Sequence, residues 1–217
     1  MMPVPISRLA QLRAGTQAAH SRIETAPALV RLVARDLTRG EYVFILQHLQ
    51  ALYTHLEPAV AAELETLPAA AALLDGSRPR RLAEDLAWFG ASALPPPPLP
   101  VLAGPAAALG ALYVIEGSGL GGRIIGRNVA ECLGVAPGAG GSFFCGLDAE
   151  SARVRWSRLS SILDESLIEA DSADAGTDAD DRVVAGARDT FGFFERCFRR
   201  IEVADQSGNV MADAVAS

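Results

Sequence analysis

The chain has 217 residues, and hydrophobic residues make up 50% of them, which is enough to form the core of one globular domain. Its formal net charge of −7 disfavours general binding to nucleic acid or to an anionic membrane surface. The three cysteines have no metal-binding spacing, and neither a secretion signal nor a long apolar run is evident, so we expect a cytoplasmic protein.

Apolar residues recur at helical spacing through the first half of the chain. A first helix is predicted over residues 5–26, and a capping box at Thr38–Glu41 opens a second that extends to about Glu65. Ser77 is expected to cap a third helix. The proline-rich run at residues 94–100 can be neither a helix nor a central strand, so it predicts a stiff, extended connector.

Further helices are expected in the second half. A glycine-rich helix ends near Gly134, and Asp148 can cap a helix that runs to about Glu169 and turns Val154 toward the core. The acidic run at residues 171–181 lacks the ligand pattern of a calcium loop, which predicts a solvated loop.

The last predicted helix runs from about Asp181 to Val203, and residues 204–217 look like a loose tail. No segment shows the alternation that is typical of a strand. The chain is therefore predicted to be an all-α protein with a single helical domain over residues 1–203.

Five glycines stand close together in the middle of the chain: Gly117, Gly119, Gly121, Gly122 and Gly126. Each glycine inside a helix costs about 0.5–1 kcal/mol relative to alanine. In return, glycine permits the close approach of the backbone to a flat ligand or of one helix to another. Gly117, Gly119 and Gly122 also match the G-x-G-x-x-G dinucleotide motif. That motif requires a preceding strand, which is not predicted here.

A polar stripe on the first predicted helix joins Arg13, His20 and Glu24. Histidine is the usual ligand where a protein binds haem iron through imidazole, and a carboxylate one turn on can accept a hydrogen bond from the other ring nitrogen. Arg13 lies where it could meet a haem propionate. An ordinary surface ion pair explains the same pattern, and His48 and His55 are interpreted as structural residues.

Two motifs together resemble the haem oxygenase family, bacterial type: LRAGTQAAHSRIE at residues 12–24 and YVIEGSGLGG at residues 113–122. The sequence looks most similar to bacterial members, including those that supply biliverdin to bacterial phytochromes. It implies a helical fold with haem between a proximal and a distal helix. It also implies that haem, as both substrate and cofactor, is opened to biliverdin, carbon monoxide and ferrous iron. Dioxygen and electrons from an external reductase or ferredoxin would be consumed.

The resemblance also assigns roles to residues. His20 would bind the iron, and Gly117, Ser118 and Gly121 would form the catalytic distal wall. Many family members have an aspartate, which orders a water chain, at the position of Ser118. The residues expected to hold haem are Arg13, Glu24, Tyr113, Gly122, Arg155 and Arg158.

Two other functions remain open from the sequence. A carrier or sensor could bind haem in the same pocket without turning it over. The related helical thiamin-degrading enzymes need a nucleophilic cysteine in a polar pocket, and neither Cys132 nor Cys145 has such surroundings in the sequence.

Overall fold

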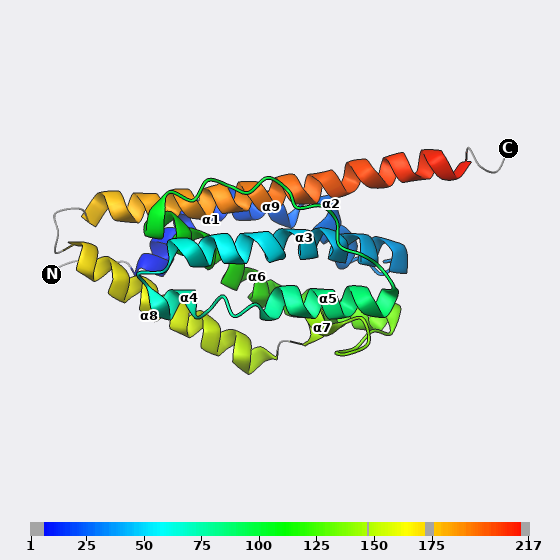
Figure 1. The fold of residues 1–217 in the computed structure, drawn as a ribbon, viewed down its shortest axis with the longest axis horizontal. Helices are drawn as coiled ribbons and strands as arrows, with labels where there is room; N and C mark the ends of the chain where they lie inside the picture. The colour runs from blue at the N-terminus through cyan, green and yellow to red at the C-terminus, as the bar shows by residue number, and fades with distance from the viewer. Residues whose placement is uncertain (1–6, 147, 172–175, 214–217) are drawn as a thin grey trace.

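The computed structural model describes residues 7–146, 148–171 and 176–213, and this part of the chain is a bundle of helices without a strand (Figure 1). The all-α prediction is confirmed. The helices are α1 (Arg8–Glu24), α2 (Pro27–Leu32), α3 (Arg39–Glu63), α4 (Pro68–Ala71), α5 (Ser77–Phe89), α6 (Gly104–Leu133), α7 (Ser142–Cys145), α8 (Ala149–Asp171) and α9 (Gly176–Asp213).

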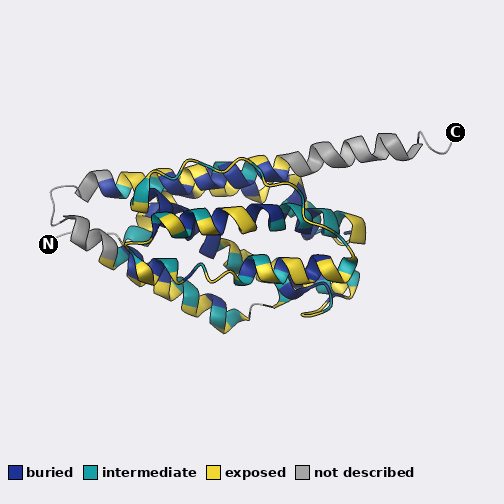
Figure 2. Ribbon diagram, in the orientation of Figure 1, coloured by how far each residue is buried: buried dark blue, intermediate teal, exposed yellow. Residues whose placement is uncertain are grey.

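Helix α6 is the centre of the bundle, because it packs against α2, α3, α7, α8 and α9. Its first half is wholly buried from Ala107 to Glu116, whereas much of its glycine-rich second half is exposed (Figure 2). Glycines bring α6 and α9 together, since a Cβ built on Gly110 would lie 2.1 Å from the carbonyl oxygen of Val183. One end of α6 therefore builds the core, and the other is left to line a cavity.

The predicted capping box at the start of α3 is confirmed. The Thr38 hydroxyl accepts a hydrogen bond from the Glu41 N–H at 3.3 Å, and the Glu41 carboxylate accepts one from the Thr38 N–H at 2.8 Å. Arg31 donates two further hydrogen bonds to the same carboxylate, which ties α2 to α3. The hydrogen bonds from Arg31 lower the pKa of Glu41 to about 2.

Replacing Glu41 by alanine is expected to lower the free energy of unfolding by about 1–2 kcal/mol at pH 7. Because the pKa of Glu41 falls on folding, its contribution is present above the ordinary value of 4.5 and is lost as the pH falls toward about 2. Urea unfolding between pH 7 and pH 3 checks this: the difference from wild type should shrink with falling pH. The control is Glu41→Gln, which can keep the capping box and should show much less pH dependence.

Several boundaries differ from the prediction. Ser77 lies inside α5 rather than capping it, because Gly76, with a φ of 69°, makes the turn and Asp75 accepts the Ser77 N–H. Pro27 starts the short helix α2 instead of only ending α1, since proline suits the first turn of a helix. The short helices α4 and α7 were not predicted, because four residues are too few to show a period.

Three predictions about the C-terminal half were wrong. Val154 is 57% exposed, because the buried stripe of α8 follows Ala152, Leu159 and Leu163 instead. The last helix continues to Asp213 rather than ending near Val203, and no proline interrupts that stretch. Helices also replace much of the acidic loop expected over residues 171–181, of which residues 172–175 lie outside the described part. The domain boundary at residue 203 stays a prediction.

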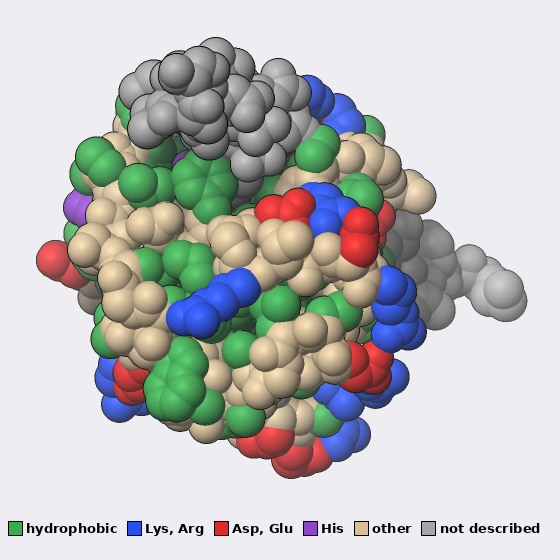
Figure 3. All heavy atoms as spheres, turned by 90° about the vertical axis from the view of Figure 1, so that its right-hand side faces the viewer, with side chains coloured by type: hydrophobic (Ala, Val, Ile, Leu, Met, Phe, Trp, Pro, Cys, Tyr) green, Lys and Arg blue, Asp and Glu red, His purple; other side chains and the backbone are tan. Residues whose placement is uncertain are grey.

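The connector between α5 and α6 is extended, as its prolines predict, from residue 91 to residue 103. No helix within the described residues is long and apolar enough to cross a membrane. On the face shown in Figure 3, apolar side chains gather toward the middle, and acidic and basic side chains stand beside one another near its edge. Neither sign of charge dominates that face.

Candidate haem-binding site

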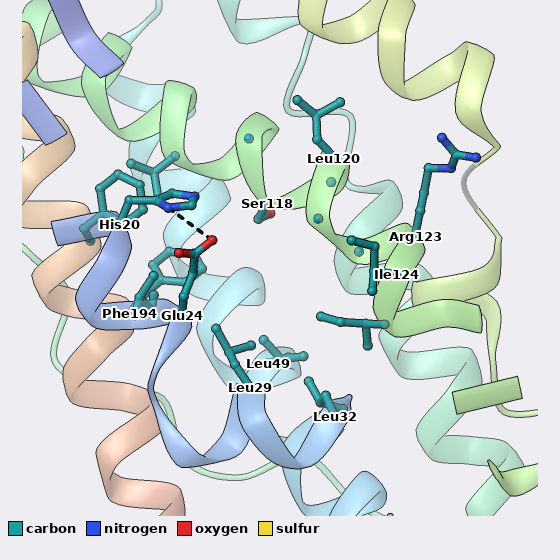
Figure 4. A pocket seen from close by; sticks show the side chains of 18 of the residues that line it. His20, Glu24, Leu29, Leu32, Leu49, Ser118, Leu120, Arg123, Ile124 and Phe194 are labelled. Carbon is teal, nitrogen blue, oxygen red and sulfur yellow. Dashed lines mark ion pairs between the residues drawn. The ribbon is translucent and has the colours of Figure 1, made fainter. Parts of the chain in front are cut away.

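A cavity of about 840 Å³ lies between α1 and α2 on one side and the second half of α6 on the other (Figure 4). Its volume is typical of a site for a cofactor or a small molecule. Helices α3, α5, α7, α8 and α9 complete the walls. Most of the lining is apolar, from Ile23, Leu29, Leu32, Leu49, Val114, Ile125, Phe143, Phe144, Phe191, Phe194 and Phe198.

His20 and Glu24 line the cavity from α1. The imidazole Nδ1 and the carboxylate Oε1 are 3.4 Å apart, which is long for a hydrogen bond but fits an ion pair one helical turn apart. The ring packs edge-on against Phe191, with 5.8 Å between the ring centroids. The other ring nitrogen, Nε2, has no partner among the described residues and is available to a ligand.

The glycines of α6 divide into two groups. A Cβ on Gly121 would meet no atom within 4 Å, and one on Gly122 would lie 3.9 Å from the Phe144 ring. Both residues line the cavity, as do Gly117 and Gly119. Gly126 differs, because its Cβ would lie 2.4 Å from the Phe144 carbonyl oxygen. Helix packing therefore explains Gly126, as it explains Gly110, whereas Gly117, Gly119, Gly121 and Gly122 line the cavity.

The dinucleotide interpretation of these glycines is wrong. The match to G-x-G-x-x-G lies inside α6, which is helical from Gly104 onward. The fingerprint instead needs a turn between a strand and a helix, and the described residues contain no strand before α6.

Ser118 lies at the middle of the cavity wall in Figure 4. Its hydroxyl donates to the carbonyl of Ile115 at 2.7 Å, so the hydroxyl of Tyr53, 3.0 Å away, donates to Ser118. Burial raises the pKa of Tyr53 above its ordinary value, which keeps the phenol neutral. A pair of neutral hydroxyls thus occupies this part of the cavity wall, where the resemblance in sequence had suggested an aspartate in other proteins.

A buried ion-pair network fixes the start of the glycine-rich segment. Arg78 lines the cavity and donates to Glu57 at 3.0 Å and to Glu116 at 2.8 Å. Burial raises the pKa of Glu57, whose second oxygen has no hydrogen-bond partner among the described residues. Because Glu116 immediately precedes Gly117, the network holds the backbone at the point where α6 enters the cavity wall.

Arg81 adds a second guanidinium to the cavity wall beside Arg78. Its Nε is buried and makes no hydrogen bond to any described residue. Tyr53, Arg78 and Arg81 were not predicted as site residues. Their spacing on α3 and α5 is that of ordinary core and surface positions, so the sequence carried no signal for them.

Arg155 and Arg158 were expected to hold propionates, and the structure brings neither to the cavity. Arg155 turns away because its guanidinium binds Glu116, at 2.9 and 3.0 Å, together with Asp75 and the carbonyl of Leu73. Arg158 is exposed on α8 and does not line the cavity. Arg13 and Tyr113 do line it.

The remaining histidines and cysteines lie elsewhere. The Nδ1 atoms of His48 and His55 contact backbone carbonyls one turn earlier in α3, at 2.8 and 2.9 Å, and neither ring lines the cavity. None of the three cysteines, all of which lie in the described part of the chain, forms a disulfide. Burial raises the pKa of Cys145, which disfavours a thiolate nucleophile. Within the described residues, no group of three potential metal ligands gathers.

One relative is similar in sequence over part of the chain. A haem oxygenase of Xanthomonas campestris pv. campestris (strain 8004) is 36% identical over 119 residues, which are 54% of this chain. The chain thus covers 64% of the length of that relative, somewhat less than two thirds. No model of a known protein family matches the chain.

Solved structures of similar fold cover nearly the whole chain. The haem oxygenase of Neisseria meningitidis has a TM-score of 0.72, at 21% identity over 91% of this chain and 92% of that one. Haem oxygenase-1 of the cyanobacterium Synechocystis sp. PCC6803, solved in complex with haem, has a TM-score of 0.67, at 15% identity over 98% and 100%. The haem oxygenase of Leptospira interrogans has a TM-score of 0.66, at 21% identity over 90% and 100%.

At these identities the structural matches establish the fold. The resemblance drawn from the motifs at residues 12–24 and 113–122 is therefore confirmed: the chain has the fold of bacterial haem oxygenases and is similar in sequence, over 119 residues, to one haem oxygenase.

Proposed function

We propose that the protein is a haem oxygenase, which opens haem to biliverdin, carbon monoxide and ferrous iron. The observation that carries the proposal is the cavity, which His20 faces from α1 while the glycines of α6 line it from the opposite side. The lining fits haem, since apolar walls suit the porphyrin faces and the open space at Gly121 suits a flat ring. Haem is bound in the similar structure from Synechocystis.

Each wall of the cavity has a separate task in this proposal. His20 binds the iron through Nε2, and Glu24 faces Nδ1, which fixes the tautomer and the orientation of the ring. The bare backbone of Gly117 and Gly121 leaves room for dioxygen on the other face. Bound haem supplies the iron at which dioxygen reacts and the ring that is opened.

Proton supply in this proposal relies on hydroxyl groups rather than a carboxylate. Tyr53 donates to Ser118, and the exposed Ser118 hydroxyl can accept a further hydrogen bond from water in the cavity. Arg78 lies in the adjoining wall with its charge compensated by Glu57 and Glu116. The pair therefore orients water without placing a negative charge beside the ligand.

The neutral Tyr53–Ser118 pair also favours one alternative, a haem carrier or sensor. The response to reductant distinguishes a haem oxygenase from a haem carrier or sensor. Purified protein is loaded with one equivalent of haem and then given electrons and dioxygen. An enzyme should lose its Soret band and form biliverdin and carbon monoxide in stoichiometric amounts. A carrier should keep the Soret band and release neither product.

Replacing Glu24 by alanine should lower haem affinity or turnover by about 10–100-fold, because the imidazole loses the group that orients it. Glu24 is exposed in the haem-free protein, so the fold should be little affected. The measurement is a haem titration with the iron–histidine stretching frequency of the ferrous form. An unchanged frequency together with unchanged turnover would exclude the orienting role.

The proposal also includes partners that match this chemistry. Electrons come from an external reductase or ferredoxin, as the resemblance in sequence implies. Biliverdin supply to a bacterial phytochrome rests on the resemblance in sequence, and a cytoplasmic location rests on the composition of the sequence.

A further inference from the structure

Trp156 closes one end of the cavity, and the proposed function gives it no role. It reaches the cavity from α8. Its ring centroid is 5.6 Å from that of Tyr113, and the Arg13 guanidinium carbon lies 6.0 Å from the ring. A Cβ built on Gly117 would lie 3.5 Å from the indole.

These contacts join the two helices that face each other across the cavity. Arg13 lies on α1, two turns before His20, and Tyr113 and Gly117 lie on α6, one turn apart. The indole of Trp156 therefore holds α1 and α6 at a fixed separation at this end of the cavity. A half-buried aromatic ring on a third helix is a rigid spacer, since it has only two rotatable bonds.

The same end of the cavity offers donors for an anion. Arg13 makes no ion pair with any described carboxylate, so its charge is available to a ligand. The indole N–H of Trp156 likewise makes no hydrogen bond within the described part of the chain. The Arg13–Trp156–Tyr113 cluster thus combines a cation, a free donor and two aromatic rings.

Resting on the proposed function, we propose that Trp156 is a positioning residue that fixes how haem is rotated in its own plane. It holds Arg13 and Tyr113 at one end of the cavity, and that end accepts the haem carboxylates. The place of the carboxylates thereby determines which edge of the haem ring lies under the glycines of α6. The attacked meso carbon follows from this in-plane orientation, the seating of haem, because the place of the propionates determines which meso carbon lies under the glycines.

The test compares Trp156→Leu with Trp156→Phe. Leucine fills the space but removes the aromatic contacts, whereas phenylalanine restores a ring. The first readout needs no turnover: the paramagnetically shifted haem methyl signals of the ferric complex report each seating. Loss of the aromatic and cation–π contacts should change the ratio of seatings by roughly 5- to 30-fold. The biliverdin isomer ratio should change in parallel, and phenylalanine should restore most of both.

The matched control is Trp88→Phe, since Trp88 is the other tryptophan, is 59% exposed and does not line the cavity. It should leave the methyl signals and isomers unchanged. Melting curves of the haem-free variants check the fold. Should the leucine variant not fold, Arg13→Met removes the cation from the indole face and should change the seating in the same way.

The failures of the two proposals can be told apart. Wild-type protein that gives no haem complex in a Soret titration contradicts the proposed function. A wild-type complex with one seating, and a Trp156→Leu complex with the same methyl signals and isomers, overturns the role of Trp156. A phenylalanine variant that behaves like leucine also overturns it, since ring contacts then do not set the seating.

Discussion

Replacing Gly121 by leucine is expected to lower haem turnover by at least about 100-fold while the haem-free protein stays folded. The structure gives the physical reason for both halves of this result. A Cβ on Gly121 meets no atom within 4 Å, so the new side chain does not clash with the protein. Leucine is also the better helix former, by roughly 0.5–1 kcal/mol. It would instead fill the space that the ligand needs.

The measurement pairs a melting curve of the haem-free variant with its rate of biliverdin formation. Gly110→Ala is the matched control, because its Cβ would lie 2.1 Å from the backbone of α9. This control should lose about 1–3 kcal/mol or more of stability through overpacking. A stable Gly121→Leu variant with wild-type turnover would show that this residue does not lie against haem.

Replacing His20 by alanine is expected to remove the axial ligand of haem and to lower turnover at least about 100-fold, beyond the effect expected for Glu24. The His20 side chain is 57% exposed, so the free energy of unfolding should change by about 0.5 kcal/mol or less. Ferric and carbon monoxide spectra of the variant should lose the signature of a bound imidazole. Added imidazole should restore part of it.

The other two histidines provide the controls for this experiment. His48 and His55 contact the backbone of α3 and do not line the cavity, so their alanine variants should keep the wild-type spectra. Wild-type spectra for His20→Ala, together with altered spectra for His48→Ala or His55→Ala, would show that the iron ligand lies on α3 and not on α1.

Much of the fold was predictable because its signals are local. The Thr38–Glu41 capping box, the terminal Gly134 and the proline-rich connector each act within a few residues, and each lies where the sequence indicated. Val154 was placed wrongly because the period of a helix does not say which stripe its neighbours will cover.

The candidate site was predictable where one helix carries the pattern. His20 and Glu24 share a face of α1, and the glycines share a stretch of α6, so spacing alone brought each set together. Tyr53 and Arg78 could not be found in this way, because they meet Ser118 and Glu116 only once α3 packs on α6 and α5 packs on α3. Arg155 was assigned to a propionate because the sequence does not show that Glu116 already binds it.

The most direct test of the central claim is a crystal structure of the protein in complex with haem. The account predicts that Nε2 of His20 binds the iron and that the opposite face of the ring lies against the backbone of Gly117 and Gly121. Both propionates should lie toward Arg13. Iron bound to His48 or His55, or a ring that lies outside the cavity between α1 and α6, would contradict it.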